Sequence, residues 1–177
     1  MNDVKCVGCT LCLPYCPRAA IFMTSSRKAR IDEDKCVECY VCIRSSVCPT
    51  EAFEETPLEW PRSLRRAFSA VQREHKETGI PGRGTEEMKT NDVTGRYPYG
   101  VVGFSVDVGR PGVGTTFEDV EKIAMAVANV GVDFEILNPL THLMTDRKTG
   151  KLRNDIKRER VNSCIIEFKT GMEKAPE

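Results

Sequence analysis

Apolar and polar residues alternate at the start of the last third of the chain. From Gly100 to Val108 every second residue is apolar, which is the period of a half-buried β-strand. Val132 to Leu137 predicts a second strand, and two short runs around the turn 146–150 predict a hairpin. The run from Val161 to Phe168 predicts a last strand that closes the sheet.

A helical period lies between the first two of these strands. Thr115 or Thr116 can cap this helix, and two carboxylates follow in its first turn, as the helix dipole favours. We expect the helix to run to about Asn129, with Gly131 as its C-terminal stop. Its predicted buried stripe consists of Val120, Ile123, Ala124, Val127 and Ala128.

A second amphipathic helix is predicted before this region, from near Pro61 to a point before Gly79. The pattern predicts packing of its apolar stripe on a neighbouring domain, or alternatively docking of a partner subunit. We expect its arginine-rich face to be solvated. The stripe consists of Trp60, Leu64, Phe68, Val71 and His75.

Glycine and polar residues fill the stretch from Thr78 to Tyr99, which shows neither a helical nor a strand period and predicts a long loop. Such a loop either tethers two domains or reaches into a partner's active site or interface. In the second case Arg83 and Lys89 are the residues to test. The stretch provides no catalytic triad.

Cysteine spacing gives the first chemical signal. Eight of the nine cysteines lie in two copies of one pattern, Cys6-x2-Cys9-x2-Cys12-x3-Cys16-Pro17 and Cys36-x2-Cys39-x2-Cys42-x5-Cys48-Pro49. Three thiolates spaced by two residues can surround one corner of an iron-sulfur cube, while a remote Cys-Pro ligates the other cluster. Zinc fits poorly because it favours two separated Cys-x2-Cys knuckles, and a disulfide framework or c-type haem fits less well still.

The two copies also align outside their cysteines, with Lys5-Cys6-Val7 matching Lys35-Cys36-Val37. On these motifs, residues 1–56 resemble a bacterial-type ferredoxin with two 4Fe-4S clusters. The resemblance implies that one cluster is held by Cys6, Cys9, Cys12 and Cys48, and the other by Cys36, Cys39, Cys42 and Cys16. The second copy has two extra residues before its last cysteine, so we expect the loop beside the first cluster to bulge.

The order of elements after residue 97 resembles an ACT-like or ferredoxin-like α/β sandwich, with helices on one face of a sheet. The predicted fold class is therefore α+β. The expected division is a ferredoxin domain at 1–56, a linker with an amphipathic helix and a polar loop at 57–96, a small α/β domain at 97–172, and a tail at 173–177. In ACT-like domains the turn that corresponds to Gly109–Gly114 binds small ligands; here it either presents N–H groups to an anion or only needs glycine torsion angles.

The remaining candidates have structural explanations. Cys164 is expected to be an inert core thiol in the last strand, and His75 and His142 have no second histidine nearby. We expect apolar cover for the clusters from six residues: Val7, Leu11, Ile21, Val37, Val41 and Ile43.

Charge narrows the choice of partners. The chain has 26 basic and 26 acidic side chains, and residues 1–56 have 7 and 8. A near-neutral chain lacks both the net positive charge expected of a nucleic-acid binder and the strongly acidic character that steers a diffusing carrier. Because no apolar run reaches about 20 residues and no secretory signal is evident, we expect a cytoplasmic protein.

The sequence thus predicts an electron-transfer subunit for a partner oxidoreductase, without substrate chemistry of its own. Two alternatives stay open. The C-terminal part is a ligand-binding or regulatory module, with structural or redox-sensing clusters, or it is an accessory part that completes a partner's active site. The C-terminal part also suits homo-oligomerisation.

Overall fold

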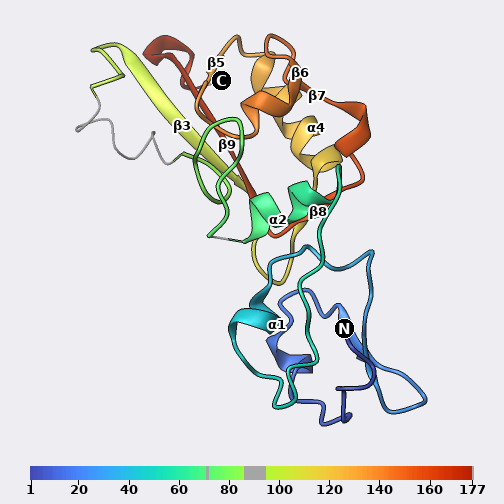
Figure 1. Cartoon of the computed structure of the whole chain (residues 1–177). Coiled ribbons are helices and arrows are strands. Elements are labelled where there is room, and N and C mark those ends of the chain that lie inside the picture. The colour runs from blue at the N-terminus through green and yellow to red at the C-terminus, as the bar shows by residue number, and fades with distance from the viewer. Residues whose placement is uncertain (71, 86–94, 177) are drawn as a thin grey trace.

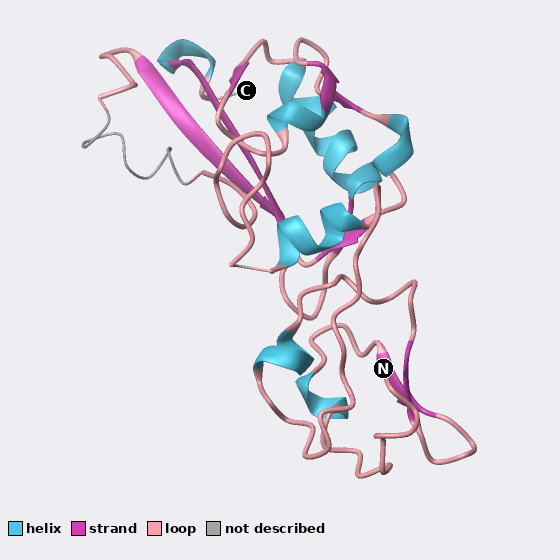
Figure 2. Cartoon of the chain, viewed as in Figure 1, coloured by secondary structure: helices cyan, strands magenta, loops and turns pink. Residues whose placement is uncertain are grey.

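The computed structural model describes residues 1–70, 72–85 and 95–176. The described chain forms two packed parts that lie end to end, with one short helix, α2, between them (Figure 1). The N-terminal part is mostly loop, whereas the C-terminal part has the long strands and the long helix (Figure 2). The candidate metal centre lies in the loop-rich part.

Two short strands and one helical turn frame the N-terminal part. Strands β1 (Ile21–Met23) and β2 (Ala29–Ile31) pair as an antiparallel hairpin, and α1 is Val41–Arg44. A 3-10 turn at Leu13–Tyr15 occupies in the first copy the place that α1 has in the second. The core here is small, and its buried members are Cys6, Cys12, Ile21, Ala29 and Ala52. Thiols therefore take the space that a soluble domain usually fills with larger side chains.

The C-terminal part is built on a three-stranded antiparallel sheet in the order β3-β9-β5. Strand β3 (Val101–Val108) was predicted correctly and pairs along its length with β9 (Cys164–Gly171), from Val101 opposite Gly171 to Val108 opposite Cys164. Strand β5 (Asp133–Phe134) pairs with the other edge of β9. The last strand therefore lies at the centre of the sheet, and it starts three residues later than predicted.

The predicted long helix is α4, Phe117–Ala128. Thr116 caps it by accepting a hydrogen bond from the Asp119 N–H at 3.1 Å. Val120, Ala124 and Ala128 are buried, and Ile123 and Val127 pack beside them, so the predicted stripe is confirmed. The helix lies between β3 and β5 in the chain and covers the sheet with its apolar face.

Small strands and 3-10 turns complete the C-terminal part. The predicted strand 132–137 is only two residues long, because a turn follows it, in which the Asn138 N–H donates to the Glu135 carbonyl at 3.2 Å. The predicted hairpin is present as β6 (Met144–Asp146) and β7 (Lys151–Leu152). Strands β4 (Thr115–Thr116) and β8 (Arg160–Val161) form a further pair, and 3-10 turns lie at Thr141–Leu143, Asn154–Ile156 and Met172–Lys174. Within residues 95–176 no second α-helix separates β5 from β9.

Helix α2 (Ser63–Ser69) is much shorter than the sequence predicted. Ala70 adopts an extended conformation (φ −103°, ψ 106°), and His75 donates its N–H to the Ile80 carbonyl, so the chain reverses instead of continuing a helix. Leu64 and Phe68 nevertheless pack in the C-terminal core as predicted, whereas Trp60 of the same predicted stripe is 44% exposed. Val71 lies outside the described residues.

Candidate metal centre

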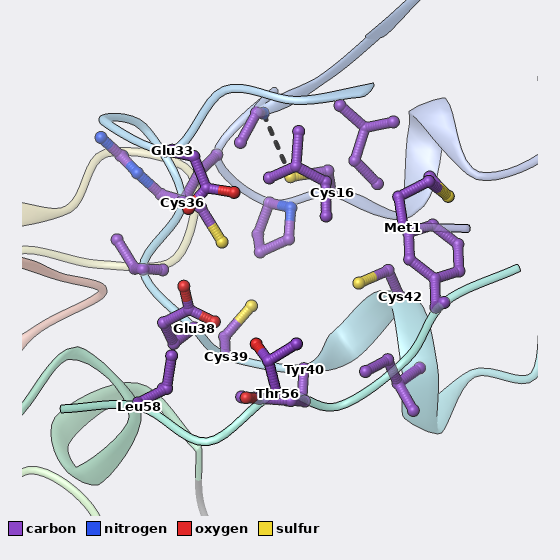
Figure 3. A pocket seen from close by; sticks show the side chains of 18 of the residues that line it. Met1, Cys16, Glu33, Cys36, Glu38, Cys39, Tyr40, Cys42, Thr56 and Leu58 are labelled. Carbon is purple, nitrogen blue, oxygen red and sulfur yellow. Dashed lines mark hydrogen bonds between the residues drawn. The ribbon is translucent and has the colours of Figure 1, made fainter. Parts of the chain in front are cut away.

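The eight repeated cysteines line two separate cavities. The first cavity is lined by Cys6, Cys9, Cys12 and Cys48, together with Val7, Gly8 and Ala29. The second cavity, of about 190 Å³, is lined by Cys36, Cys39, Cys42 and Cys16. Each cavity thus combines three closely spaced cysteines of one copy with the last cysteine of the other copy. Figure 3 shows the four sulfur atoms of the second cavity turned toward one central space.

Backbone N–H groups point at the cysteine that comes from the other copy. Ala20 donates its N–H to Cys16 Sγ at 3.2 Å, and Ala52 donates to Cys48 Sγ at 3.3 Å. The first cavity has one more such bond, from Ala29 N–H to Cys6 Sγ at 3.4 Å. Hydrogen bonds of this kind stabilise sulfur that carries negative charge, as a metal-bound thiolate does.

The loops around the two cavities repeat one backbone conformation. Gly8 and Glu38 occupy equivalent positions and both have positive φ, 72° and 54°. Three pairs of equivalent residues share this left-handed geometry: Gly8 with Glu38, Thr10 with Tyr40, and Ala19 with Glu51. Because non-glycine residues pay a cost for positive φ, its repetition indicates that the tight curl around each cavity requires it.

The first turn of each copy is closed by the same side-chain bonds. Asn2 Oδ1 accepts from the N–H groups of Val4 and Lys5, and Asp32 Oδ1 accepts from those of Asp34 and Lys35. Two main-chain bonds repeat as well: Asn2 N–H donates to the Ala52 carbonyl, and Asp32 N–H donates to that of Ala20, both at 2.7 Å. Each of these two main-chain bonds therefore joins the start of one copy to the other copy.

Thiol acidity differs around the cavities. Burial raises the pKa of Cys36 to about 12 and that of Cys42 to about 11. At Cys48 burial also acts to raise the pKa, but hydrogen bonds from the Ala52 N–H and the Thr50 hydroxyl outweigh it, and the pKa is lowered. Thiols with raised pKa bind metal only by releasing a proton, so metal binding at the second cavity is coupled to proton release.

The thiols stand too far apart for a single ion. Among the described residues, no three histidine, cysteine or carboxylate side chains converge closely enough to hold one metal ion. Around the second cavity, of about 190 Å³, the four thiols enclose more space than a tetrahedral zinc site, in which all four sulfurs lie about 2.3 Å from one metal. They fit a cofactor that itself fills the space, such as an iron-sulfur cube.

The family comparison agrees with this geometry. Residues 5–52 match the family model of the 4Fe-4S dicluster domain. This segment contains the eight cysteines of the two cavities. Residues 5–52 form a 4Fe-4S dicluster domain.

Two curated relatives match the dicluster domain. It is 40% identical over 52 residues to one component of the ion-translocating oxidoreductase complex of Methanosarcina acetivorans, a match that covers 29% of this chain and 19% of the relative. It is 35% identical over 52 residues to the PorD component of the pyruvate synthase of Methanocaldococcus jannaschii, covering 29% of this chain and 58% of the relative. The chain thus spans less than two thirds of either relative. No solved structure matches the chain.

The apolar cover of the dicluster domain is less complete than predicted. Ile21 and Val37 are buried, 7% and 1% exposed, and line or flank the cavities as expected. Val7 and Leu11 are 64% and 53% exposed, although Val7 lines the first cavity as expected. The two extra residues of the second copy are absorbed by α1 and by Ser46 at φ 49°.

The arginine face of α2 is not solvated, contrary to the prediction, because it contacts the dicluster domain. Arg62 pairs with Glu38 at 2.5 Å and lines the second cavity. Arg65, only 7% exposed, donates through Nη1 to the carbonyls of Glu33 and Cys36, both at 2.8 Å. Arg66 lies over the Tyr40 ring, 4.1 Å from its centroid. Helical periodicity identified this face, but the sequence carried no signal of what it contacts.

The turn Gly109–Gly114 also contacts the dicluster domain. Gly114 has φ +69°, and a Cβ at this position would lie 2.7 Å from the Arg18 guanidinium. Gly112 lies near the Pro17 carbonyl. The glycines thus allow a close approach between the two parts of the chain, which favours the structural interpretation of this turn.

The other singled-out residues have structural surroundings. Cys164 is 0% exposed and burial raises the pKa of its thiol, as expected of core sulfur. His75 is buried, hydrogen-bonds the Gly82 carbonyl at 2.6 Å and meets Phe68 edge to face. His142 is exposed and bonds the Ile136 carbonyl. Arg83 of the predicted polar loop pairs with Asp107 at 3.3 Å, whereas Lys89 lies outside the described residues. No helix in the described ranges is long and apolar enough to cross a membrane.

Proposed function

We propose that this chain transfers electrons through two 4Fe-4S clusters to or from a partner oxidoreductase. The observation that carries the proposal is the composition of the two cavities, each with three closely spaced cysteines and a fourth from the other copy. The match to a dicluster domain supports it. When bound, the clusters supply one-electron transfer.

The lining of the two cavities supports one assignment of the cluster ligands. Cys6, Cys9, Cys12 and Cys48 hold the first cluster, and Cys36, Cys39, Cys42 and Cys16 hold the second. The N–H groups of Ala20, Ala29 and Ala52 stabilise the sulfur charge. Ile21 and Val37 keep water away from the space between the ligands.

A place within a larger complex is the setting we propose. Both relatives are named as subunits of larger enzymes, and this chain has no net charge to steer a diffusing carrier. The same proposal includes a partner oxidoreductase, a cytoplasmic location, self-association through the C-terminal part and no role in nucleic-acid binding. It also includes domain boundaries at residues 56, 96 and 172 and an ACT-like fold for the last domain.

Regulation through a small ligand is the second candidate. The contact between Gly114 and Arg18 makes the Gly109–Gly114 turn a poor place for such a ligand, because the domain already occupies its surface. If the C-terminal part is regulatory, it acts on the dicluster domain through the contacts that the two parts make with each other.

Ligand variants of the reconstituted chain test the proposal. Oxygen-free reconstitution should give roughly eight iron and eight sulfide per chain, with a reducible chromophore. Cys16→Ala and Cys36→Ala should leave the same paramagnetic resonance spectrum after reduction, because both lose the second cluster. Cys48→Ala and Cys6→Ala should share the other spectrum. Cys164→Ala, which removes the ninth thiol, is the control and should keep full iron content.

Two results would count against the proposal. A preparation that holds only zinc, or no reducible chromophore, would exclude electron transfer. A Cys16→Ala spectrum that equals that of Cys6→Ala would mean that each copy holds its own cluster, and would overturn the ligand assignment.

A further inference from the structure

We propose that Arg65 sets the reduction potential of the second cluster and allows the C-terminal part to change that potential. In the same proposal Lys28, which belongs to the dicluster domain itself, sets the reduction potential of the first cluster. The inference rests on the proposed function, since it concerns the clusters. It concerns two cations that contact equivalent carbonyls.

The two carbonyls belong to the first cysteine of each copy. Lys28 Nζ donates a hydrogen bond to the carbonyl of Cys6. Arg65 Nη1 donates to the carbonyl of Cys36 at 2.8 Å. Cys6 and Cys36 are equivalent in the repeat and line the first and the second cavity. Each half of the dicluster domain therefore has one cation at the same place of its ligand loop.

The sources of the two cations differ. Lys28 comes from the turn between β1 and β2, whose tip also covers Gly8, where a Cβ would lie 2.2 Å from the Arg27 carbonyl. The second copy has no such hairpin after its last cysteine, and α2 covers it instead. There Arg62 pairs with Glu38, which is the equivalent of Gly8. Helix α2 thus replaces the missing hairpin.

Arg65 also reaches the C-terminal part. Its Nε donates to Glu159 Oε2 at 2.5 Å, while Nη1 binds the two carbonyls of the ligand loop. The side chains of Arg65 and Glu159 are 9% and 13% exposed, so water screens this pair little. The guanidinium lies between the ligand loop and the Glu159 carboxylate, so the positive charge of Arg65 is closer to the loop than the negative charge of Glu159.

Electrostatics gives the sign of the effect. A cluster gains one negative charge on reduction, so a nearby cation stabilises the reduced form and raises the potential. Glu159 weakens the field of Arg65 and holds the guanidinium in place. By linkage, any event that draws Glu159 and Arg65 away from the loop makes the second cluster harder to reduce, and reduction in turn tightens the hold of the loop on Arg65.

Redox titrations of the reconstituted full chain, followed by paramagnetic resonance, test the proposal. Arg65→Gln should move the potential of one cluster to a more negative value and leave the other unchanged. Lys28→Gln should also make the reduction potential more negative, but that of the other cluster. Glu159→Gln should make the reduction potential more positive, at the same cluster that responds to Arg65→Gln. Arg65→Lys should keep most of the wild-type potential.

Arg73→Gln is the matched control, because Arg73 is half exposed and lies 3.9 Å from Glu55 without touching a ligand loop. It should change neither potential. The proposal is overturned if Arg65→Gln and Glu159→Gln leave both potentials unchanged, if both shift the same cluster in the same direction, or if Lys28→Gln and Arg65→Gln act on one cluster. Should Arg65→Gln fail to assemble, Glu159→Gln and Arg65→Lys still decide the sign. Absence of reducible clusters in the wild type would instead count against the proposed function.

Discussion

Phe68 of α2 and Phe117 of α4 meet edge to face, with ring centroids 5.1 Å apart and an interplanar angle of 84°. Both rings are buried, 3% and 0% exposed, in the C-terminal core. The opposite face of α2 holds the dicluster domain through its arginines. One seven-residue helix therefore joins the two parts of the described chain. Its apolar face packs in the C-terminal core, and its charged face contacts the dicluster domain.

Removing this ring should weaken the C-terminal part. We expect Phe68→Ala to lower the free energy of unfolding by about 3–5 kcal/mol, because a large buried ring leaves a cavity behind. Denaturant titration followed by the fluorescence of Trp60, the single tryptophan, measures the loss. Phe22→Ala is the control, since that ring is 47% exposed, and it should cost less than about 1 kcal/mol. Equal losses in both variants would contradict the role of α2.

Glycine at position 8 is expected to be essential for the first cavity. An alanine Cβ there would lie 2.2 Å from the Arg27 carbonyl, and the residue has φ +72°. We predict that Gly8→Ala lowers the iron content of the reconstituted chain to about half, because the hairpin no longer closes over the first ligand loop. Gly79→Ala, at φ +68° with no atom within 4 Å of its Cβ, is the matched control. Full iron content in Gly8→Ala would refute the prediction.

Asn138 should contribute strongly to stability. It is 0% exposed and donates to the Ile165 carbonyl at 3.0 Å, while its Oδ1 accepts from the Leu140 N–H at 2.8 Å. Asn138→Ala removes these two bonds and a third to Glu167, whose carboxylate keeps its bonds from Thr85, at a cost of about 3 kcal/mol or more. Thermal unfolding measures the effect. Asn129 is exposed, so the control Asn129→Ala should change stability by less than about 0.5 kcal/mol. The prediction is disproved if Asn138→Ala also loses less than that.

His75 should make stability depend on pH near neutrality. Burial lowers the pKa of its imidazole below the ordinary value of 6.5. Below that value the unfolded chain binds a proton that the folded chain does not, so stability present above pH 6.5 is lost as the pH falls toward the folded pKa. Unfolding of wild type and His75→Gln between pH 7.5 and 5.5 measures this, and the variant should show the smaller loss. Parallel profiles for His75→Gln and wild type would exclude the effect.

Local patterns predicted the elements whose signals lie within a few residues. The alternation in β3, the Thr116 cap and the apolar stripe of α4 are all present in the structure. The repeated cysteines identified the cofactor class before any fold was known, because ligand spacing along the chain limits which metal group the thiols can surround.

The tertiary structure decided what these elements contact. The sequence predicted a long α2 with a solvated arginine face, and the structure shows seven residues whose arginines bind the loop of Cys36. The sequence left open whether the Gly109–Gly114 turn binds a ligand or only needs glycine torsion angles, and in the structure Gly112 and Gly114 make room for Pro17 and Arg18. Spacing along the chain fixes which residues share a face, whereas the partner of that face comes from a segment far away in sequence. The thiol pattern by itself therefore predicted an iron-sulfur site, and only long-range packing determined that the C-terminal part lies against one of the two cysteine cavities.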